Sequence, residues 1–182
     1  MKTREWKTVW KADIEVDMRV EGLDAPEKIV KGGQQHKMFR FVTANKRDGA
    51  VTIVEKENKI ALVKHNRLAI EKVSLELPQG MGDVLDKDGI ETGMREAEEE
   101  LGIKVSHGIS LGQIFADSAI TANKIHVITC KYEHDSGVGD GEIISVHWTE
   151  KDEVVKLIKD SKIKDGISIA ALMKYFIYKK IV

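Results

Sequence analysis

The feature that most restricts the fold of this chain is an acidic segment at residues 88–102, DGIETGMREAEEELG. Asp88 is a suitable N-cap and Gly102 suits the left-handed turn that ends a helix, so the segment between them is predicted to be helical. At about 100° per residue, one side of this helix carries four apolar residues: Ile90, Met94, Ala97 and Leu101. The helix therefore has one face for a hydrophobic core.

The opposite side of the helix is acidic. Glu96, Glu99 and Glu100 fall within an arc of about 100°, whereas Glu98 points away from them. Like-charge pairs at this spacing cost roughly 0.2–0.5 kcal/mol each, so something must offset the repulsion. A solvated acidic surface is the simplest interpretation of such a run. Three oxygen ligands on one rigid face also suit Mg²⁺ or Mn²⁺, and a bound cation would remove the repulsion.

The composition limits the class of protein. With 182 residues, of which 42% are hydrophobic, the chain is long enough for one domain with terminal additions. A net charge of −1 and a pI near 6.6 give no electrostatic reason to expect a nucleic acid or an anionic membrane as partner. The single cysteine, Cys130, excludes an intramolecular disulfide and suits a reducing compartment. Without an apolar leader or a run of roughly 18 apolar residues, we expect a cytoplasmic protein.

The remaining pattern predicts more strands than helices. Apolar and polar residues alternate over residues 13–20, and a hairpin is predicted from two apolar segments, 50–54 and 59–65, around a polar turn. Further strands are predicted at residues 37–44, 73–77, 109–115, 124–132 and 142–148. Two helices follow, one with Thr149 as its N-cap and one over residues 169–177. Because strands and helices do not alternate regularly, the pattern favours a mixed α+β sandwich.

Residues 80–103, GMGDVLDKDGIETGMREAEEELGI, resemble the signature of the Nudix hydrolases. In that signature a glycine is followed after five residues by an acid, and after seven more by Arg-Glu-apolar-x-Glu-Glu-x-Gly-apolar. The stretch REAEEELGI matches the second part at every fixed position. In the first part Asp86 stands where glutamate is usual, and eight residues separate it from Arg95, which indicates a one-residue insertion around Lys87–Gly89. The insertion bears on the acid–arginine contact that usually braces this loop, and not on the acidic face.

The resemblance extends to the ADP-ribose pyrophosphatase branch in two further segments, at residues 61–80 and 141–176. It implies a Nudix-type α/β/α sandwich with a mixed sheet and additional N-terminal strands. Residues 1–45 would form an N-terminal strand extension in the interface of a homodimer, and residues 46–182 would form the hydrolase domain. Family members often use such strands to form a domain-swapped dimer.

The resemblance also implies an activity, the metal-dependent hydrolysis of the pyrophosphate bond of a small nucleoside diphosphate sugar. ADP-ribose, cleaved to AMP and ribose 5-phosphate, is the first expectation. The cofactor would be Mg²⁺, with Mn²⁺ as an alternative. Glu96 and Glu100 would be the main metal ligands, Glu99 would share metal or water contacts, and the carbonyl of Gly80 would complete the shell.

A catalytic base and two substrate contacts are implied as well. Glu142, in the glycine-rich segment GVGDGE, is the expected base, with its neighbour Asp140 less well placed and Glu99 as the fallback. Arg67 matches the position of a substrate-contacting arginine, and Arg40 is a weaker candidate. The simpler interpretations are an ordinary turn acid for Glu142 and a surface residue for Arg67.

Other functions remain as alternatives. The segment IFADSAITANKIHV, after the signature, lacks the proline of the Ser-Pro-Gly-like turn that is usual in ADP-ribose pyrophosphatases. Another ADP-sugar or a GDP-sugar is therefore a close alternative substrate. A non-catalytic Nudix domain that senses a nucleotide, and a purely structural interaction module, are alternatives of other classes. The intact set of three glutamates argues against both.

Overall fold

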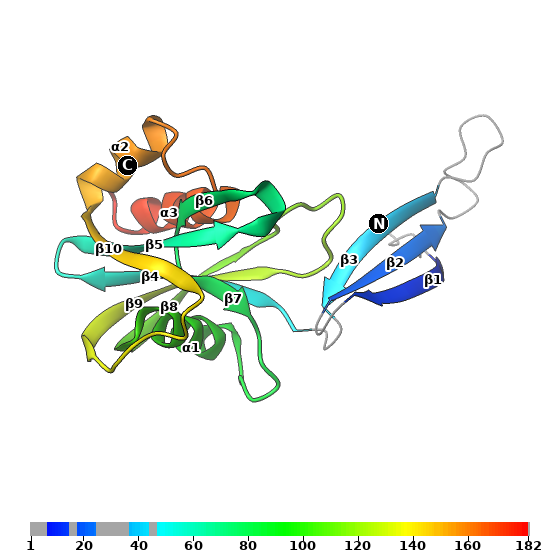
Figure 1. Cartoon of the computed structure of the whole chain (residues 1–182), viewed down its shortest axis with the longest axis horizontal. Coiled ribbons are helices and arrows are strands. Elements are labelled where there is room, and N and C mark those ends of the chain that lie inside the picture. Colours follow the sequence, from blue (N-terminus) through cyan, green and yellow to red (C-terminus); the bar gives the residue numbers. More distant parts are fainter. Residues whose placement is uncertain (1–6, 15–17, 25–36, 44–46, 182) are drawn as a thin grey trace. The chain divides into compact units, whose positions relative to one another are not determined.

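The chain folds into two compact units (Figure 1). The structure, a computed structural model, describes residues 7–14, 18–24, 37–43 and 47–181. The N-terminal unit comprises residues 1–47 and 115–123, and the main unit comprises residues 48–114 and 124–182. Each unit has its own sheet. Among the helices that the structure describes, none combines the length and the apolar character needed to cross a membrane.

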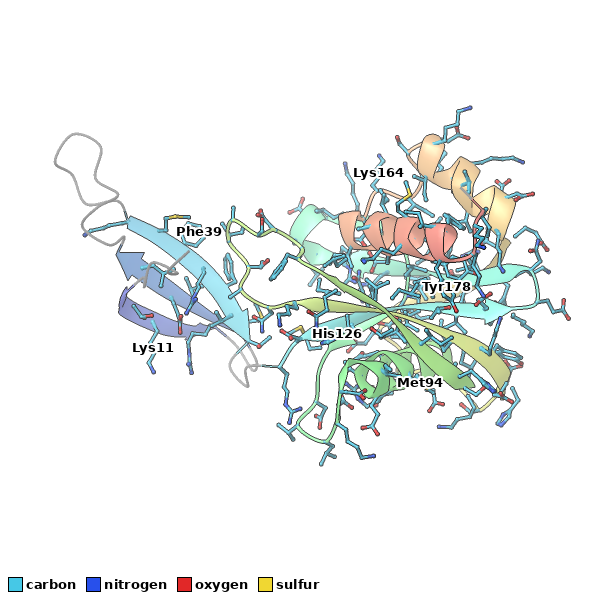
Figure 2. All side chains as sticks on the ribbon, turned by 180° about the vertical axis from the view of Figure 1, so that it is seen from behind. Lys11, Phe39, Met94, His126, Lys164 and Tyr178 are labelled. Atoms are coloured by element: carbon cyan, nitrogen blue, oxygen red, sulfur yellow. The ribbon has the colours of Figure 1, made fainter. Side chains whose placement is uncertain are left out.

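The N-terminal unit contains an antiparallel sheet in the order β1-β2-β3, with the strands β1 (Lys7–Ile14), β2 (Met18–Asp24) and β3 (Lys37–Thr43). The prediction of one strand over residues 13–20 is wrong, because Ile14 pairs with Met18 across two antiparallel strands. The apolar alternation continues on both sides of residues 15–17, which lie outside the described residues. On β3, Phe39, which is labelled in Figure 2, is in edge-to-face contact with Phe41, and the two ring centroids lie 5.9 Å apart.

The main unit is built on a mixed sheet of seven strands: β4 (Gly49–Lys56), β5 (Lys59–Arg67), β6 (Lys72–Glu76), β7 (Gln79–Met81), β8 (Ile103–Ile114), β9 (Ile125–Asp135) and β10 (Ile143–Glu150). Their order is β10-β5-β4-β9-β8, with β6 paired to β5 and β7 paired to β4. The pair β4–β9 is parallel and the other pairs are antiparallel. A short 3₁₀ helix, η2 (Leu68–Ile70), follows β5. The predicted hairpin of β4 and β5 is confirmed.

Helices cover both faces of this sheet, α1 (Gly89–Leu101) on one face and α2 (Lys151–Lys159) and α3 (Gly166–Tyr178) on the other (Figure 1). Successive side chains of a strand point to opposite faces. On β4, Val51 and Ile53 accordingly belong to the core that contains Leu172 of α3. Val54 belongs to the core that contains Ala97 of α1. This arrangement confirms the predicted α+β sandwich with a mixed sheet (Figure 1).

The helix ends follow local signals in two of the three cases. Asp88 caps α1 by accepting from the amides of Ile90 and Glu91, at 2.8 and 3.0 Å, and Gly102 ends the helix with φ 63°, both as predicted. Helix α3 begins earlier than predicted, directly after its N-cap Asp165.

The prediction of Thr149 as the N-cap of α2 is wrong. Thr149 lies within β10, where it pairs with Ile60, and α2 begins after Glu150. Strand pairing with β5 continues beyond the residue that local capping preference selects.

Glu55 forms a buried ionic network on the side of the sheet that faces α3. Its carboxylate is 3.2 Å from Lys131 Nζ, 3.1 Å from Lys151 Nζ and 3.0 Å from Lys179 Nζ. Burial alone would raise the pKa of Glu55, but the Tyr175 hydroxyl and the three lysines outweigh burial and lower the pKa to about 2. The three lysines come from β9, the start of α2 and the end of α3, so the network ties these elements to the central strand.

Replacing Glu55 with Gln should destabilise the fold by about 3–5 kcal/mol, because it removes the counter-ion of partly buried lysines. The free energy of unfolding, measured in urea at pH 7, tests this. Glu153→Gln is the matched control, since Glu153 forms an exposed ion pair with Lys156 on the same helix α2. Equal stability of Glu55→Gln and the wild type would contradict the role of the network.

The same variant should change the response of stability to acid. The pKa of Glu55 is about 2 in the folded protein and 4.5 ordinarily, so its stabilising contribution is complete above pH 4.5. The contribution is lost as the pH falls from about 4.5 towards about 2. Glu55→Gln should therefore lose stability less steeply than the wild type in this range, and identical slopes would contradict the assignment.

Candidate active site

Helix α1 is seated directly on the sheet at two glycines. A Cβ atom at Gly93 would lie 2.7 Å from Thr52 Oγ1, and this hydroxyl donates to the Gly93 carbonyl at 2.7 Å. At the start of the helix, a Cβ at Gly89 would lie 2.1 Å from the ring of His126 on β9 (Figure 2). The absence of a Cβ at both positions lets the helix approach the strands closely. The acidic side of α1 is thereby held beside β7.

Arg95 connects the acidic side of α1 to the loop before it. Its Nε and Nη2 donate to the two carboxylate oxygens of Asp86 at 3.0 Å each, and its Nη1 donates to Glu99 at 2.7 Å. Nη2 also donates to the Met81 carbonyl at 2.9 Å and lies 3.0 Å from a Glu96 oxygen. The acid–arginine contact is therefore present in this chain, although the loop is one residue longer.

Local hydrogen bonds hold the turn that precedes α1. The backbone amide and the Nζ of Lys87 both contact Glu91, at 2.7 Å each. On the other side of the loop, Asp86 accepts from the Asp83 amide at 2.8 Å. These local hydrogen bonds leave Asp86 within reach of Arg95.

The same contacts explain how the like charges are tolerated. A hydrogen bond to a charged group contributes roughly 1.5–3 kcal/mol, several times the cost of one like-charge pair on a helix. Burial raises the pKa of Asp86, but the hydrogen bonds from Arg95 and the Asp83 amide outweigh burial and lower it. Glu98 is separate, as predicted, and contacts Lys104 Nζ at 2.5 Å and the Val105 amide at 3.0 Å.

Glu100 and Glu96 differ from the other acids because burial dominates their environment. Glu100 is only 5% exposed, and its Oε2 is buried without a hydrogen-bond partner among the described residues. Burial raises the pKa of Glu100 to about 8, against an opposing hydrogen bond from the Gln79 backbone. Burial also raises the pKa of Glu96, although the neighbouring Arg95 opposes the shift. A cation beside these two carboxylates would remove the penalty of burying negative charge.

The backbone of Gly80, on β7, lies in contact with the Glu96 carboxylate. A Cβ at Gly80 would be 2.0 Å from Oε2 and 2.2 Å from Cδ of Glu96. No side chain fits at this position unless Glu96 moves. The carbonyl of Gly80 lies above Gly49, where a Cβ would be 2.9 Å from its oxygen. Gly80 and the acidic face of α1 are therefore in contact, with Glu96 as the carboxylate that a Cβ at Gly80 would meet; the role of the Gly80 carbonyl as a metal ligand stays a prediction.

The fit of these residues to a divalent cation is partial. Glu96 and Glu100 are close enough for the charge of Glu96 to raise the pKa of Glu100, and the unpartnered Glu100 oxygen is a suitable ligand. Glu99 instead faces solvent and is held by Arg95. In the part of the chain that the structure describes, no three His, Cys, Asp or Glu side chains are gathered tightly enough to hold a metal together. Two carboxylates fit the cation, and Glu99 would join them only by leaving Arg95.

The loop of residues 136–142 brings Asp140 to the end of α1. The Asp140 amide donates to the Glu99 carbonyl at 3.0 Å, and the negative charge of Asp140 helps to raise the pKa of Glu100. Asp140 Oδ1 accepts from the Glu142 amide at 2.9 Å, which orients the start of β10. The side chain of Glu142 itself is exposed.

Arg67, at the end of β5, lies near the same site. Its positive charge lowers the pKa of Glu100, against the larger effect of burial, and its Nη2 forms an ion pair with Glu76. Glu76 is 1% exposed and was not predicted as part of the site. The sequence signal for Glu76 is an acidic residue between two leucines, Leu75 and Leu77, in a predicted strand.

Arg40 belongs to the N-terminal unit. Its Nε and Nη2 both donate to one Glu21 oxygen, at 2.9 and 2.7 Å. The guanidinium thus has a partner on the neighbouring strand β2. Its suggested role in substrate binding stays a prediction.

The family model of the NUDIX domain matches residues 45–171. The chain therefore belongs to the Nudix family and is a Nudix pyrophosphohydrolase. The methanol dehydrogenase activator of Bacillus methanolicus is 28% identical over 160 residues, covering 85% of this chain and 84% of that protein. The ADP-ribose pyrophosphatase of Bacillus subtilis (strain 168) is 24% identical over 180 residues, covering 94% of this chain and 93% of that protein.

Solved structures share the fold. An ADP compounds hydrolase superposes with a TM-score of 0.79 at 16% identity, covering 99% of this chain and 97% of that chain. A NUDIX hydrolase from Nitrosomonas europaea superposes with a TM-score of 0.60 at 18% identity, covering 73% of this chain and 90% of that chain. The resemblance inferred from the signature segment is thus confirmed at the level of family and fold.

Gly80→Ala should displace the Glu96 carboxylate, because the added methyl group would occupy its place. We expect the divalent-cation concentration that half-saturates hydrolysis to rise about 10–100-fold, as for other groups that support a metal ligand. A cation titration of activity measures this. Gly166→Ala is the matched control, since a Cβ there meets nothing within 4 Å. An unchanged cation requirement in Gly80→Ala would contradict the contact.

Proposed function

We propose that this Nudix hydrolase cleaves the pyrophosphate bond of a nucleoside diphosphate sugar, with ADP-ribose as first substrate and AMP and ribose 5-phosphate as products. The observation that carries the proposal is the buried Glu100 and the half-buried Glu96 beside Gly80, with one Glu100 oxygen left without a partner among the described residues. Likeness to the Bacillus subtilis ADP-ribose pyrophosphatase over 94% of this chain supports the substrate class.

The cofactor in this proposal is Mg²⁺, with Mn²⁺ as the alternative. Glu96 and Glu100 would hold it, with Glu99 and the carbonyl of Gly80 as further ligands. The bound cation would neutralise the diphosphate and stabilise the charge that develops as the phosphorus–oxygen bond breaks. Glu100 would hold the cation as a deprotonated carboxylate.

The chain's own side chains supply positioning and proton transfer. Arg67 is part-exposed, so the N–H groups that do not face Glu76 are available to grip a phosphate. Glu142 would accept the proton of the attacking water. Its loop is attached to α1 at the Glu99 carbonyl, which supports a place near the metal ligands. Glu99 is the alternative base, although its 2.7 Å contact with Arg95 competes with that role.

Residues 1–45 in this proposal form a strand extension that pairs two chains into a homodimer, with residues 46–182 as the hydrolase domain. Three strands need a hydrophobic face to be stable, and the apolar side chain of Phe39 on β3 is 48% exposed, so a second chain could cover it. Sedimentation equilibrium of the full chain should give the mass of a dimer, and a monomer at micromolar concentration would oppose this proposal.

The substrate assignment predicts that ADP-ribose is cleaved with Mg²⁺ and not with EDTA. Product analysis by ³¹P NMR should show AMP and ribose 5-phosphate. ADP-glucose and GDP-mannose serve as comparison substrates, and faster cleavage of either would move the assignment to that sugar nucleotide. Metal-independent binding without cleavage of all three would instead support a nucleotide sensor.

Glu142→Gln should lower kcat by about 10²–10⁴-fold, the usual contribution of a general base, with little change in the Mg²⁺ requirement. Steady-state kinetics with ADP-ribose measure both quantities, and Glu133→Gln, an exposed acid on β9, is the control. A normal kcat in Glu142→Gln, together with a large loss in Glu99→Gln, would transfer the base role to Glu99.

A further inference from the structure

Gly102 and Gly139 allow close backbone contact where the loop of residues 136–142 crosses the end of α1. A Cβ at Gly139 would lie 2.3 Å from the Glu100 carbonyl oxygen. From the other side, a Cβ at Gly102 would lie 2.5 Å from the Gly137 carbonyl oxygen and 2.8 Å from the Gly139 nitrogen. All of these neighbours are backbone atoms, which cannot rotate away as a side chain can. The loop and the helix are therefore in backbone-to-backbone contact.

Hydrogen bonds fix the register of this contact. The amides of Ser136 and Gly137 donate to the Gly102 carbonyl at 2.9 and 3.2 Å, and the Asp140 amide donates to the Glu99 carbonyl at 3.0 Å. Carbonyl groups at the end of a helix have no partner within the helix. The loop supplies these partners, so it acts as the cap of the helix that carries the acidic face.

The contact stops abruptly at the next glycine. Gly141 has φ 90°, and a Cβ there would meet nothing within 4 Å. The loop is thus attached to α1 as far as Asp140, and no atom packs against the position of a Cβ at Gly141, directly before Glu142. A movement of Glu142 would start from a fixed point set by the helix.

We propose that Gly139 is a positioning residue for the hydrolysis, because its bare Cα sets the distance between the carboxylates of α1 and the acids of the loop. This inference rests on the proposed function of Glu100 and Glu142. Gly139 touches neither substrate nor cofactor and acts through the backbone of Asp140. A side chain at this position lifts the loop from the helix and moves Glu142 away from the reacting phosphate.

Gly139→Ala tests this proposal, with Val138→Ala as the matched control, since the Val138 side chain is 99% exposed in the same loop. We expect kcat for ADP-ribose to fall about 100-fold, the effect of a misplacement of about 1 Å, while KM and Mn²⁺ affinity stay at the wild-type values. A normal kcat overturns the proposal. A joint loss of kcat, KM and Mn²⁺ affinity also overturns it, because that result indicates general damage to α1.

Amide hydrogen exchange separates this proposal from the assignment of the substrate. The Asp140 amide should exchange faster in Gly139→Ala than in the wild type or in Val138→Ala, whether or not ADP-ribose is a substrate. Equal exchange in all three overturns the backbone contact. If wild-type protein cleaves no sugar nucleotide but the exchange differs as expected, the proposed function fails and the contact stands.

A second pair of variants covers the case in which Gly139→Ala does not fold. Asp140→Pro removes the N–H that binds the Glu99 carbonyl, whereas Asp140→Asn keeps it. We expect Asp140→Pro to lose at least ten times more kcat than Asp140→Asn at equal KM. Equal kcat values in the two variants overturn the proposal.

Discussion

The contacts of one guanidinium, that of Arg95, hold the acidic site together. Arg95 binds Asp86 in the loop, the Met81 carbonyl at the end of β7, and Glu96 and Glu99 on its own helix. Charge-assisted hydrogen bonds of roughly 1.5–3 kcal/mol outweigh like-charge pairs of roughly 0.2–0.5 kcal/mol, so the cluster is stable as a whole. Among the described residues, Glu100 Oε2 has no hydrogen-bond partner, so Glu100 is the acid whose charge most needs a cation from outside the chain.

The buried glutamates on the two faces of the sheet have pKa shifts of opposite direction. Glu55 contacts three lysines on the side of α3. They help to lower the pKa of Glu55 to about 2, so its carboxylate is ionised at neutral pH. Glu100, on the side of α1, meets burial and the charges of Glu96 and Asp140, which raise its pKa to about 8. The chemistry of the side chain is the same, so the environment alone separates a structural acid from a candidate ligand.

Signals that depend on neighbouring residues in the chain predicted much of this structure. The caps Asp88 and Gly102, the two-sided helix between them and the hairpin of β4 and β5 needed only local spacing. Thr149 was predicted wrongly as a cap because pairing with Ile60, far away in sequence, extends β10 through it. The strand reversal between Ile14 and Met18 was missed because the apolar alternation matches on both sides.

The candidate site likewise combines contacts that residue spacing predicts with contacts that it does not predict. The signature predicted Glu96, Glu100 and Gly80 as site residues, and the contact between Gly80 and Glu96 lies within one short segment of the chain. The ion pair of Glu76 with Arg67 and the close approach of Gly139 to Glu100 depend on strand pairing and on a loop that crosses the helix end. Residue spacing in the sequence does not predict these contacts, because they form only when the sheet and α1 pack together.

Glu100 is the proposed ligand for a divalent cation, and Mn²⁺ binding followed by electron paramagnetic resonance tests this role most directly. The wild type should bind Mn²⁺, and Glu100→Gln should lose at least tenfold in affinity. Glu98→Gln should bind like the wild type, because Glu98 lies on the same helix but contacts Lys104 and the Val105 amide. Equal Mn²⁺ affinity in Glu100→Gln and the wild type would contradict the assignment of this acid as a metal ligand.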